Sequence, residues 1–393
     1  MRSESSAGAW LRLTALAAAG ATLLAVVSGA TGFEHRELSA LALPPLVALV
    51  VAGRVARRRL LVPSLTALVL FGCAALATGT AIHVTLAALA FAATLVTCVR
   101  AFRGEKVAAA SWRDYVTLTK PRIMALLLLT GACGMVVGAR GLPSLDLFVP
   151  TMVGLALACG GASALNHVLD ADIDRLMGKR TEKRPVAAGR IDAGRALEFG
   201  LTLSAFSFVL LASTVNVVTA ALALAGNLFY VVVYTRWLKR STPQNIVIGG
   251  AAGAVPPLVG WAAATGNLAL PALFLFLIVF FWTPPHFWAL ALLLRDNYAA
   301  ANVPMLPVVR GERETIRQIV VYTLVLIAIT LLPFAWGTLG VLYAVAALAL
   351  GGLFLALTLH LRRNATRKSA AFLFHYSLLY LALLFVAMAI DVL

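Results

Sequence analysis

The chain has 393 residues, of which 61% are hydrophobic and 12% charged, and this composition excludes a soluble globular domain. Its formal net charge of +16 would also suit a nucleic-acid-binding protein. The Lys and Arg residues cluster instead in alternate short loops between apolar stretches, which is the positive-inside pattern of membrane proteins. We therefore expect contact with membrane lipid and no nucleic-acid partner.

Residues 1–106 are predicted to form an N-terminal membrane extension of about four helices, because apolar stretches of about 20 residues can cross a bilayer as helices. The expected spans lie near residues 15–30, 41–51, 61–76 and 81–99. We interpret the first span as an uncleaved anchor, with a cleaved signal peptide as the alternative.

Residues 107–393 are predicted to form a second block of about nine transmembrane helices. An amphipathic segment at 107–120 leads into it along the membrane surface. The expected spans lie near residues 123–137, 147–165, 197–213, 217–234, 246–263, 270–294, 316–336, 339–361 and 372–390. The fold class is therefore an all-α polytopic membrane protein, and the loop charges put the N-terminus in the cytoplasm and the C-terminus outside.

An acidic stretch follows the span at 147–165. If the helix continues, Asn166, Asp170 and Asp174 fall at i, i+4 and i+8 and share one face. Carboxylates are costly near a membrane, and such oxygen ligands suit Mg²⁺ together with a substrate phosphate. Basic residues that could hold this anion follow at Arg175, Lys179, Arg180, Lys183, Arg184 and Arg190. The alternative is a helix that simply ends in a solvated, salt-bridged loop.

A second polar cluster begins with Pro284 and Pro285 inside an apolar stretch. Two prolines remove helical hydrogen bonds, so we expect a break that opens space beside His286. The alternative for His286 is a packing role. One helix later come Arg295, Asp296 and Tyr298; Asp296 alone would be an ordinary solvated acid.

Taken together, these stretches resemble the UbiA superfamily of membrane prenyltransferases, over about residues 108–393, and within it the branch of the protoheme IX farnesyltransferases (heme O synthases). The resemblance rests on the runs 118–122, 166–174, 184–185, 234–235, 243–257, 283–288, 296–298 and 304–308. Pro284-Pro285-His286-Phe287-Trp288 and Pro304-Met305-Leu306-Pro307-Val308 indicate the heme branch.

The resemblance implies a nine-helix prenyltransferase bundle in the bacterial cell inner membrane, with heme b and farnesyl diphosphate as substrates, Mg²⁺ as cofactor and heme O as product. It implies that the metal ligands are Asn166, Asp170, Asp174 and Asp296. It implies that the substrates are bound by Lys120, Arg122, Lys179, Lys183, Arg184, His286, Arg295 and Tyr298. The superfamily usually has a second acid four residues after the position of Asp296, where this chain has Ala300, so the number of Mg²⁺ ions stays open.

Two other functions stay open. One is a prenyltransferase of the same superfamily that acts on an aromatic quinone precursor, and the other is a cation-coupled transporter that uses the membrane acids as a relay. The N-terminal block, with Thr31, Gly32, His35 and His83, faintly resembles half of a heme A synthase. That enzyme acts next on heme O, which makes it a candidate partner; a packing or anchoring role is the alternative.

Overall fold

The prediction of an all-helical membrane protein is confirmed. The computed structural model describes residues 6–31, 35–56, 60–76, 80–102, 110–179 and 181–393, and its long elements are all helices. Ten of the described helical segments are long and apolar enough to cross a membrane, and three shorter apolar helices accompany them at Ser39–Arg54, Leu61–Ala75 and Leu86–Ala101. The predicted boundary between the two blocks, at residues 106 and 107, lies outside the described residues.

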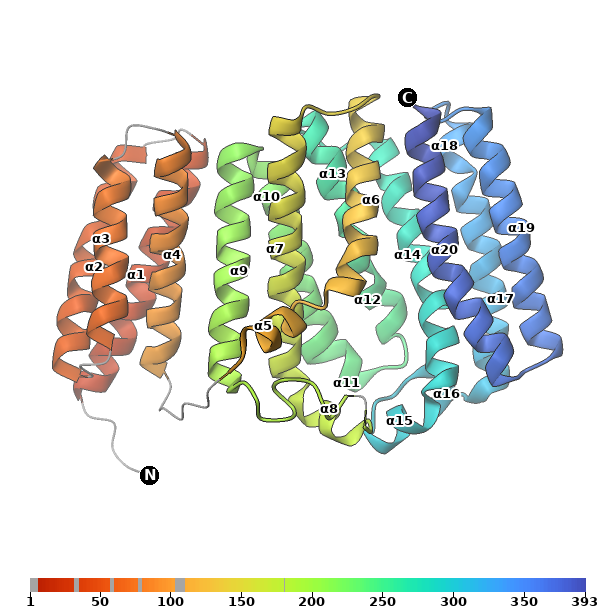
Figure 1. Cartoon of the computed structure of the whole chain (residues 1–393), viewed down its shortest axis with the longest axis horizontal. Helices are drawn as coiled ribbons and strands as arrows, with labels where there is room; N and C mark the ends of the chain where they lie inside the picture. The colour runs from red at the N-terminus through yellow and green to blue at the C-terminus, as the bar shows by residue number, and fades with distance from the viewer. Residues whose placement is uncertain (1–5, 32–34, 57–59, 77–79, 103–109, 180) are drawn as a thin grey trace.

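The N-terminal block is a bundle of four helices that stands at one side of the molecule (Figure 1). These are α1 (Ser6–Thr31), α2 (His35–Ala56), α3 (Leu61–Leu76) and α4 (Thr80–Phe102). The bundle meets the main block through α4, where Ala88 and Phe91 pack against Ala205 and Val209 of α9 (Ala193–Thr214). Near the ends of these helices, Arg100 donates to Glu198 at 3.1 Å, so packing and one ion pair join the two blocks.

The main block contains nine membrane-spanning segments among the described residues. Those formed by one long helix are α6 (Pro121–Ala139), α7 (Leu145–Leu169), α9, α14 (Leu270–Leu293), α19 (Val341–Arg363) and α20 (Arg367–Asp391). Those built from consecutive pieces are α10 (Val217–Leu228) with η2 (Phe229–Leu238) and α11 (Lys239–Ser241), α12 (Asn245–Gly253) with α13 (Val255–Thr265), and α17 (Gly311–Thr330) with α18 (Leu332–Ala335).

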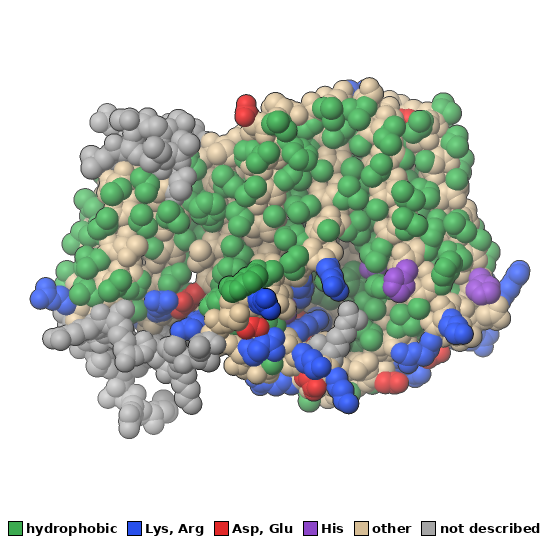
Figure 2. All heavy atoms as spheres, in the orientation of Figure 1, with side chains coloured by type: hydrophobic (Ala, Val, Ile, Leu, Met, Phe, Trp, Pro, Cys, Tyr) green, Lys and Arg blue, Asp and Glu red, His purple; other side chains and the backbone are tan. Residues whose placement is uncertain are grey.

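The short helices lie at one end of the molecule, with the exception of α18 (Figure 1). They are α5 (Trp112–Leu118), which lies within the predicted lead-in segment at 107–120, and α8 (Ala171–Leu176), α15 (Arg295–Ala300) and α16 (Leu306–Val309). Most Lys and Arg side chains visible in Figure 2 gather at the same end, below a surface covered by hydrophobic side chains. The C-terminus lies at the opposite end. The charge asymmetry expected from the loops is therefore a feature of the folded molecule.

The expected helix break at Pro284 and Pro285 was wrong. Helix α14 runs through both prolines without interruption, and both proline side chains are buried in the bundle. Membrane helices tolerate proline where neighbouring helices support the freed backbone. A break occurs instead at Ala254, which separates α12 from α13 just before Pro256 and Pro257. There the prolines stand in the first turn of a helix, where an amide proton would have no helical partner anyway.

Helices α6 and α13 approach one another through glycines. A methyl group at Gly260 would overlap the backbone carbonyl oxygen of Gly131, and one at Gly134 would lie 2.9 Å from the Cα of Pro257. In membranes the hydrophobic effect does not drive helices together, because lipid tails are as apolar as the side chains. Helices associate instead through close packing, which small residues allow.

We expect Gly260→Ala to destabilise the protein by about 1–3 kcal/mol, because rigid backbone atoms oppose the added methyl group. Thermal unfolding of the detergent-solubilised protein measures the effect. Gly352→Ala in α19 is the matched control, since nothing lies within 4 Å of its added carbon. Equal melting temperatures for the two variants would contradict the close approach of α6 and α13.

Candidate functional site

The acidic stretch lies where α7 ends, at the basic end of the molecule. It does not form one continuous helix as expected: α7 ends at Leu169, Asp170 is the junction, and α8 begins at Ala171. The i to i+4 hydrogen bonds nevertheless continue across the junction, from the Asp170 amide to Asn166 O (2.9 Å) and from the Asp174 amide to Asp170 O (2.8 Å). The expected helical spacing of the three side chains is therefore largely kept. All three are buried, with exposed fractions of 3% or less.

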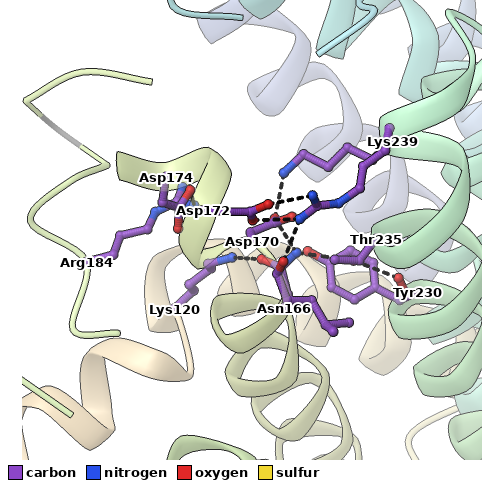
Figure 3. Close-up of polar contacts among 11 residues, drawn as sticks. Lys120, Asn166, Asp170, Asp172, Asp174, Arg184, Tyr230, Thr235 and Lys239 are labelled. Carbon is purple, nitrogen blue, oxygen red and sulfur yellow. Dashed lines mark hydrogen bonds and ion pairs between the residues drawn. The ribbon is translucent and has the colours of Figure 1, made fainter. Parts of the chain in front are cut away.

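Asn166 is the hub of the hydrogen-bond network shown in Figure 3. Its Oδ1 accepts from Lys120 Nζ at 2.8 Å, and its Nδ2 donates to Asp170 Oδ2 at 2.7 Å and to Thr235 Oγ1 at 3.2 Å. Both ends of the amide are thus used by the protein, and the side chain aligns a lysine with a carboxylate.

Lys239 completes the surroundings of Asp170. Its Nζ lies 2.5 Å from Asp170 Oδ2, and both side chains are buried. Lys239 directly follows η2, a π-helix, in which Thr235 Oγ1 also donates to the carbonyl of Tyr230 at 2.8 Å. Such helices are rare and often mark functional sites. The sequence did not predict Lys239 as a site residue; its only signal was the basic loop at 236–240, because no residue pattern announces a π-helix.

Asp174 is paired with Arg184, a contact that was expected from the sequence only under the alternative of a salt-bridged loop. Arg184 Nη1 donates to Asp174 Oδ1 at 2.6 Å. Two buried carboxylates therefore meet three cations, Lys120, Arg184 and Lys239, which come from the start of α6, the loop after α8 and the end of η2 (Figure 3). Partial burial of the cations weakens screening by solvent, so the excess of positive charge acts strongly on any bound anion.

The pKa values of the groups at this end follow from their surroundings. Burial, together with the nearby charge of Arg184, lowers the pKa of Lys120 to about 7. Burial raises the pKa of Tyr298 to about 12. Tyr298 lies near the acidic stretch, because its neighbour Asn297 donates a hydrogen bond to the carbonyl of Met177. Hydrogen bonds from Arg240 lower the pKa of the more exposed Asp172 to about 2.

One oxygen of each buried carboxylate has no hydrogen-bond partner among the described residues: Asp170 Oδ1 and Asp174 Oδ2. Buried acceptors are normally satisfied, and hard oxygen donors are what Mg²⁺ prefers, so this pair fits such an ion.

Asp296 does not join this pair. Within the described ranges, no three His, Cys, Asp or Glu side chains gather closely enough to hold a metal ion. Its side chain is exposed on α15. That helix does lie beside the site, because Asn297 Nδ2 donates to the carbonyl of Met177 at 2.6 Å. The sequence therefore placed the right segment next to the acids but not the carboxylate itself.

Of the predicted substrate-binding cations, four lie at the surface: Arg122, Lys179, Lys183 and Arg295. Arg295 is paired with Glu312 at 3.3 Å. Lys120 and Arg184 are the two predicted cations that the structure brings to the acidic site.

His286 is buried at the interface of α14 and α20, with Nδ1 2.6 Å from Ser377 Oγ. His167, next to Asn166 in α7, is also buried, but both of its ring nitrogens are sealed from solvent and have no partner among the described residues. In the N-terminal block, His83 Nδ1 contacts the carbonyl of Ala74 at 2.7 Å, and the side chain of His35 lies outside the described residues.

A pocket of about 170 Å³ opens elsewhere, between Gln244, Trp288, Arg310 and Tyr322 among other residues. Its lining includes neither Asp170 nor Asp174, and a cavity of this size is small for a prenyl chain or a porphyrin. The chemistry of the charged cluster, and not the presence of this pocket, therefore identifies the candidate site.

Comparison with known proteins gives consistent results. The model of the UbiA prenyltransferase family matches residues 127–379. Protoheme IX farnesyltransferase of Symbiobacterium thermophilum is 55% identical over 282 residues, which cover 71% of this chain and 94% of that protein. The protein of the same name from Roseiflexus sp. (strain RS-1) is 56% identical over 279 residues, which cover 71% of this chain and 52% of that protein. The chain thus spans about half the length of the Roseiflexus relatives that it matches.

A third relative of that name, from Chloroflexus aurantiacus, is 45% identical over 371 residues, covering 91% of this chain and 62% of that protein. Similarity therefore extends into the N-terminal block.

Two solved structures share the fold. A structure of digeranylgeranylglyceryl phosphate synthase has a TM-score of 0.60 at 16% identity and covers 71% of this chain and 98% of that chain. A UbiA homologue from Archaeoglobus fulgidus bound to GPP and Mg²⁺ has a TM-score of 0.51 at 17% identity, covering 70% and 99%. With the family model matched across most of the main block, the chain belongs to the UbiA prenyltransferase family.

Proposed function

We propose that this protein transfers the farnesyl group of farnesyl diphosphate to a vinyl group of heme b, where water completes the addition, giving heme O and diphosphate. The Symbiobacterium relative of that name, matched across nearly its whole length, supports the choice of substrates. The observation that carries the proposal is the pair of unpartnered carboxylate oxygens, Asp170 Oδ1 and Asp174 Oδ2, set among three buried or half-buried cations.

The two free oxygens would hold Mg²⁺. Two structures of the Archaeoglobus fulgidus homologue contain Mg²⁺ together with DMAPP or GPP, which supports the same cofactor here. Bound at Asp170 and Asp174, the ion would supply positive charge to the diphosphate. In this proposal Asn166 aligns Asp170. Asp296, which is exposed on α15, is not a ligand of the ion.

Cations of the chain would stabilise the remaining negative charge on the diphosphate. Cleavage of the allylic C–O bond leaves a carbocation and builds negative charge on the diphosphate. Lys120, Arg184 and Lys239 can donate hydrogen bonds to that leaving group in a poorly solvated site, where such donors are most effective. Arg184 and Lys239 each hold an acid through one nitrogen. A guanidinium has five N–H donors and an ammonium three, so both side chains can also donate to a phosphate oxygen.

The basic end of the molecule would face the cytoplasm of a bacterial cell, with the C-terminus on the other side of the inner membrane. The gathering of Lys and Arg at that end supports this orientation (Figure 2). For the helices α1–α4 we propose a packing and anchoring role. A complex with heme A synthase is a separate proposal, which co-purification of the two proteins from one membrane extract would test.

The direct test of function is incubation of the purified protein with heme b, farnesyl diphosphate and Mg²⁺, followed by mass analysis. We expect a heme that has gained one farnesyl group and one hydroxyl group, the hydroxyl coming from water that releases a proton. A parallel reaction offers an aromatic quinone precursor as the acceptor. Farnesylation of that acceptor and not of heme b would overturn the choice of substrate.

The first prediction concerns the free oxygens. Asp170→Asn and Asp174→Asn should each lower kcat by about 100-fold or more, because each removes a charged ligand from the proposed ion. Rates of heme O formation are measured at rising Mg²⁺ concentration. Asp172→Asn is the matched control, since Asp172 belongs to the same stretch but is exposed and paired with Arg240 at 2.7 Å. Near-normal rates in both buried variants would refute the metal assignment.

A second prediction concerns Lys239. Lys239→Met should raise KM for farnesyl diphosphate and lower kcat, each by about 10-fold or more, because it removes a donor to the leaving group. It should also destabilise the protein by about 3–5 kcal/mol, because Asp170 loses the partner of a buried ion pair.

The double variant Lys239→Met with Asp170→Asn separates these two effects. We expect it to regain thermal stability and stay inactive. Arg236→Met, one helical turn earlier and exposed, should leave both KM and stability unchanged. Full activity in Lys239→Met would exclude Lys239 from the site.

A third prediction follows from the orientation. In a protein without native cysteines, Glu182→Cys should react with a membrane-impermeant thiol reagent only from the cytoplasmic side, and Leu393→Cys only from the outside. Both positions are exposed, so access to the reagent is not limited by packing. Labelling of intact cells and of inverted vesicles gives the two readouts, and reaction of both positions from one side would reject the orientation.

A further inference from the structure

His286 is held rigidly between two aromatic rings. The ring of Trp282, one helical turn earlier in α14, lies 4.3 Å away between centroids at an interplanar angle of 15°. On α20, the ring of Phe374 lies 4.9 Å away at 22°. The plane of the imidazole is therefore fixed by stacking, and the atoms at its edge decide what the side chain can do.

Ser377 of α20 contacts this edge and is itself completely buried. Its Oγ lies 2.6 Å from His286 Nδ1 and donates to the carbonyl of Phe374 at 2.7 Å. The backbone carbonyl of Ser377 also accepts from Trp282 Nε1 at 2.8 Å, which ties the two helices together at this level. One serine thus anchors both the histidine and the tryptophan that stacks on it.

The network of these contacts assigns the proton of His286 to one of its two nitrogens. A hydroxyl has one proton, and a carbonyl oxygen can only accept, so the contact with Phe374 uses the proton of Ser377. The contact with His286 is then possible only if Nδ1–H is the donor and Oγ the acceptor. In a neutral imidazole the lone pair therefore lies on Nε2.

Nε2 is free to use that lone pair. Among the described residues, no hydrogen-bond partner contacts His286 Nε2, and this atom is not sealed from solvent, in contrast to both nitrogens of His167. The side chain keeps 6% exposure. A lone pair on a neutral nitrogen can bind a metal centre and gives nothing to a phosphate oxygen, which is also an acceptor.

We propose that Ser377 is a positioning residue that holds His286 in the Nδ1–H tautomer and presents Nε2 as an axial ligand to the iron of the heme substrate. The inference rests on the proposed function for the identity of that substrate. It assigns His286 to the heme side of the site and separates it from the diphosphate side, formed by Lys120, Arg184 and Lys239. The same arrangement, a ligating histidine whose other nitrogen donates to a fixed acceptor, orients metal ligands in many proteins.

The test is a titration of the full-length protein with ferric heme b, read by the heme absorption spectrum, which responds to loss of an axial imidazole. Ser377→Ala should weaken heme binding by about 10-fold to 100-fold and change the spectrum at saturating heme. Binding of farnesyl diphosphate, measured separately, should change less than about 2-fold, because Ser377 contributes nothing to the charged cluster. Ser377→Thr, which keeps the hydroxyl, should restore affinity and spectrum.

The matched control is Ser207→Ala, which removes another fully buried serine bridge between helices, from Ser207 Oγ to the carbonyl of Gly154 at 2.6 Å. It should lower the melting temperature without altering the heme spectrum. His286→Gly provides a second measurement that does not depend on Ser377: it should lose the imidazole-type spectrum and regain it when free imidazole is added.

An unchanged heme spectrum in Ser377→Ala or in His286→Gly would overturn the inference, as would an equal loss of affinity for heme and farnesyl diphosphate. These outcomes are distinct from failure of the proposed function. A wild-type protein that binds heme through His286 but forms no farnesylated heme would refute the function and leave the ligand assignment standing. Formation of heme O with an unaltered spectrum in His286→Gly would do the reverse.

Discussion

The burial of two carboxylates at the end of a membrane helix is the constraint on which the site depends. A charged group that leaves water must recover its solvation energy from the protein, and an unpaired buried charge is strongly destabilising. Asp170 and Asp174 meet this requirement with Lys239 and Arg184, which are distant in sequence. The pairs bring η2 and the loop after α8 to the end of α7. Asn166 joins the same place to Lys120 at the start of α6. The acids therefore organise the end of the bundle before any ligand is bound.

Much of this could be predicted from the sequence. Hydropathy predicted the membrane spans, because a helix that crosses lipid must be long and apolar. The charges of the loops predicted which end of the molecule is basic. The spacing of Asn166, Asp170 and Asp174 placed them close together, and the structure keeps their hydrogen bonds from one helical turn to the next. Lys120 and Arg184 were among six cations predicted to bind the substrates, and only the structure separated these two from the four that lie at the surface.

The features that sequence reasoning missed depend on contacts between distant segments. Lys239 reaches the site because it follows the π-helix η2, which packs against α7. Neither the π-helix nor this packing produces a periodic pattern in the sequence. Prolines were misjudged because their effect depends on the neighbours: Pro284 and Pro285 lie inside a well-packed helix, whereas Pro256 and Pro257 follow a break. For His286, the sequence suggested a cavity beside the prolines. The structure instead shows its Nδ1 in contact with Ser377, which lies 91 residues later in the chain.

The contact between α4 and α9 affects how lipid-soluble molecules reach the interior. Ala88 and Phe91 of α4 pack against Ala205 and Val209 of α9, and Arg100 and Glu198 form an ion pair between the same two helices near their ends. Acyl chains of the bilayer cannot occupy a face that another helix already covers. A hydrophobic molecule that enters the main bundle sideways from the membrane must therefore pass between helices on the remaining part of the perimeter, which the first four helices leave open to lipid.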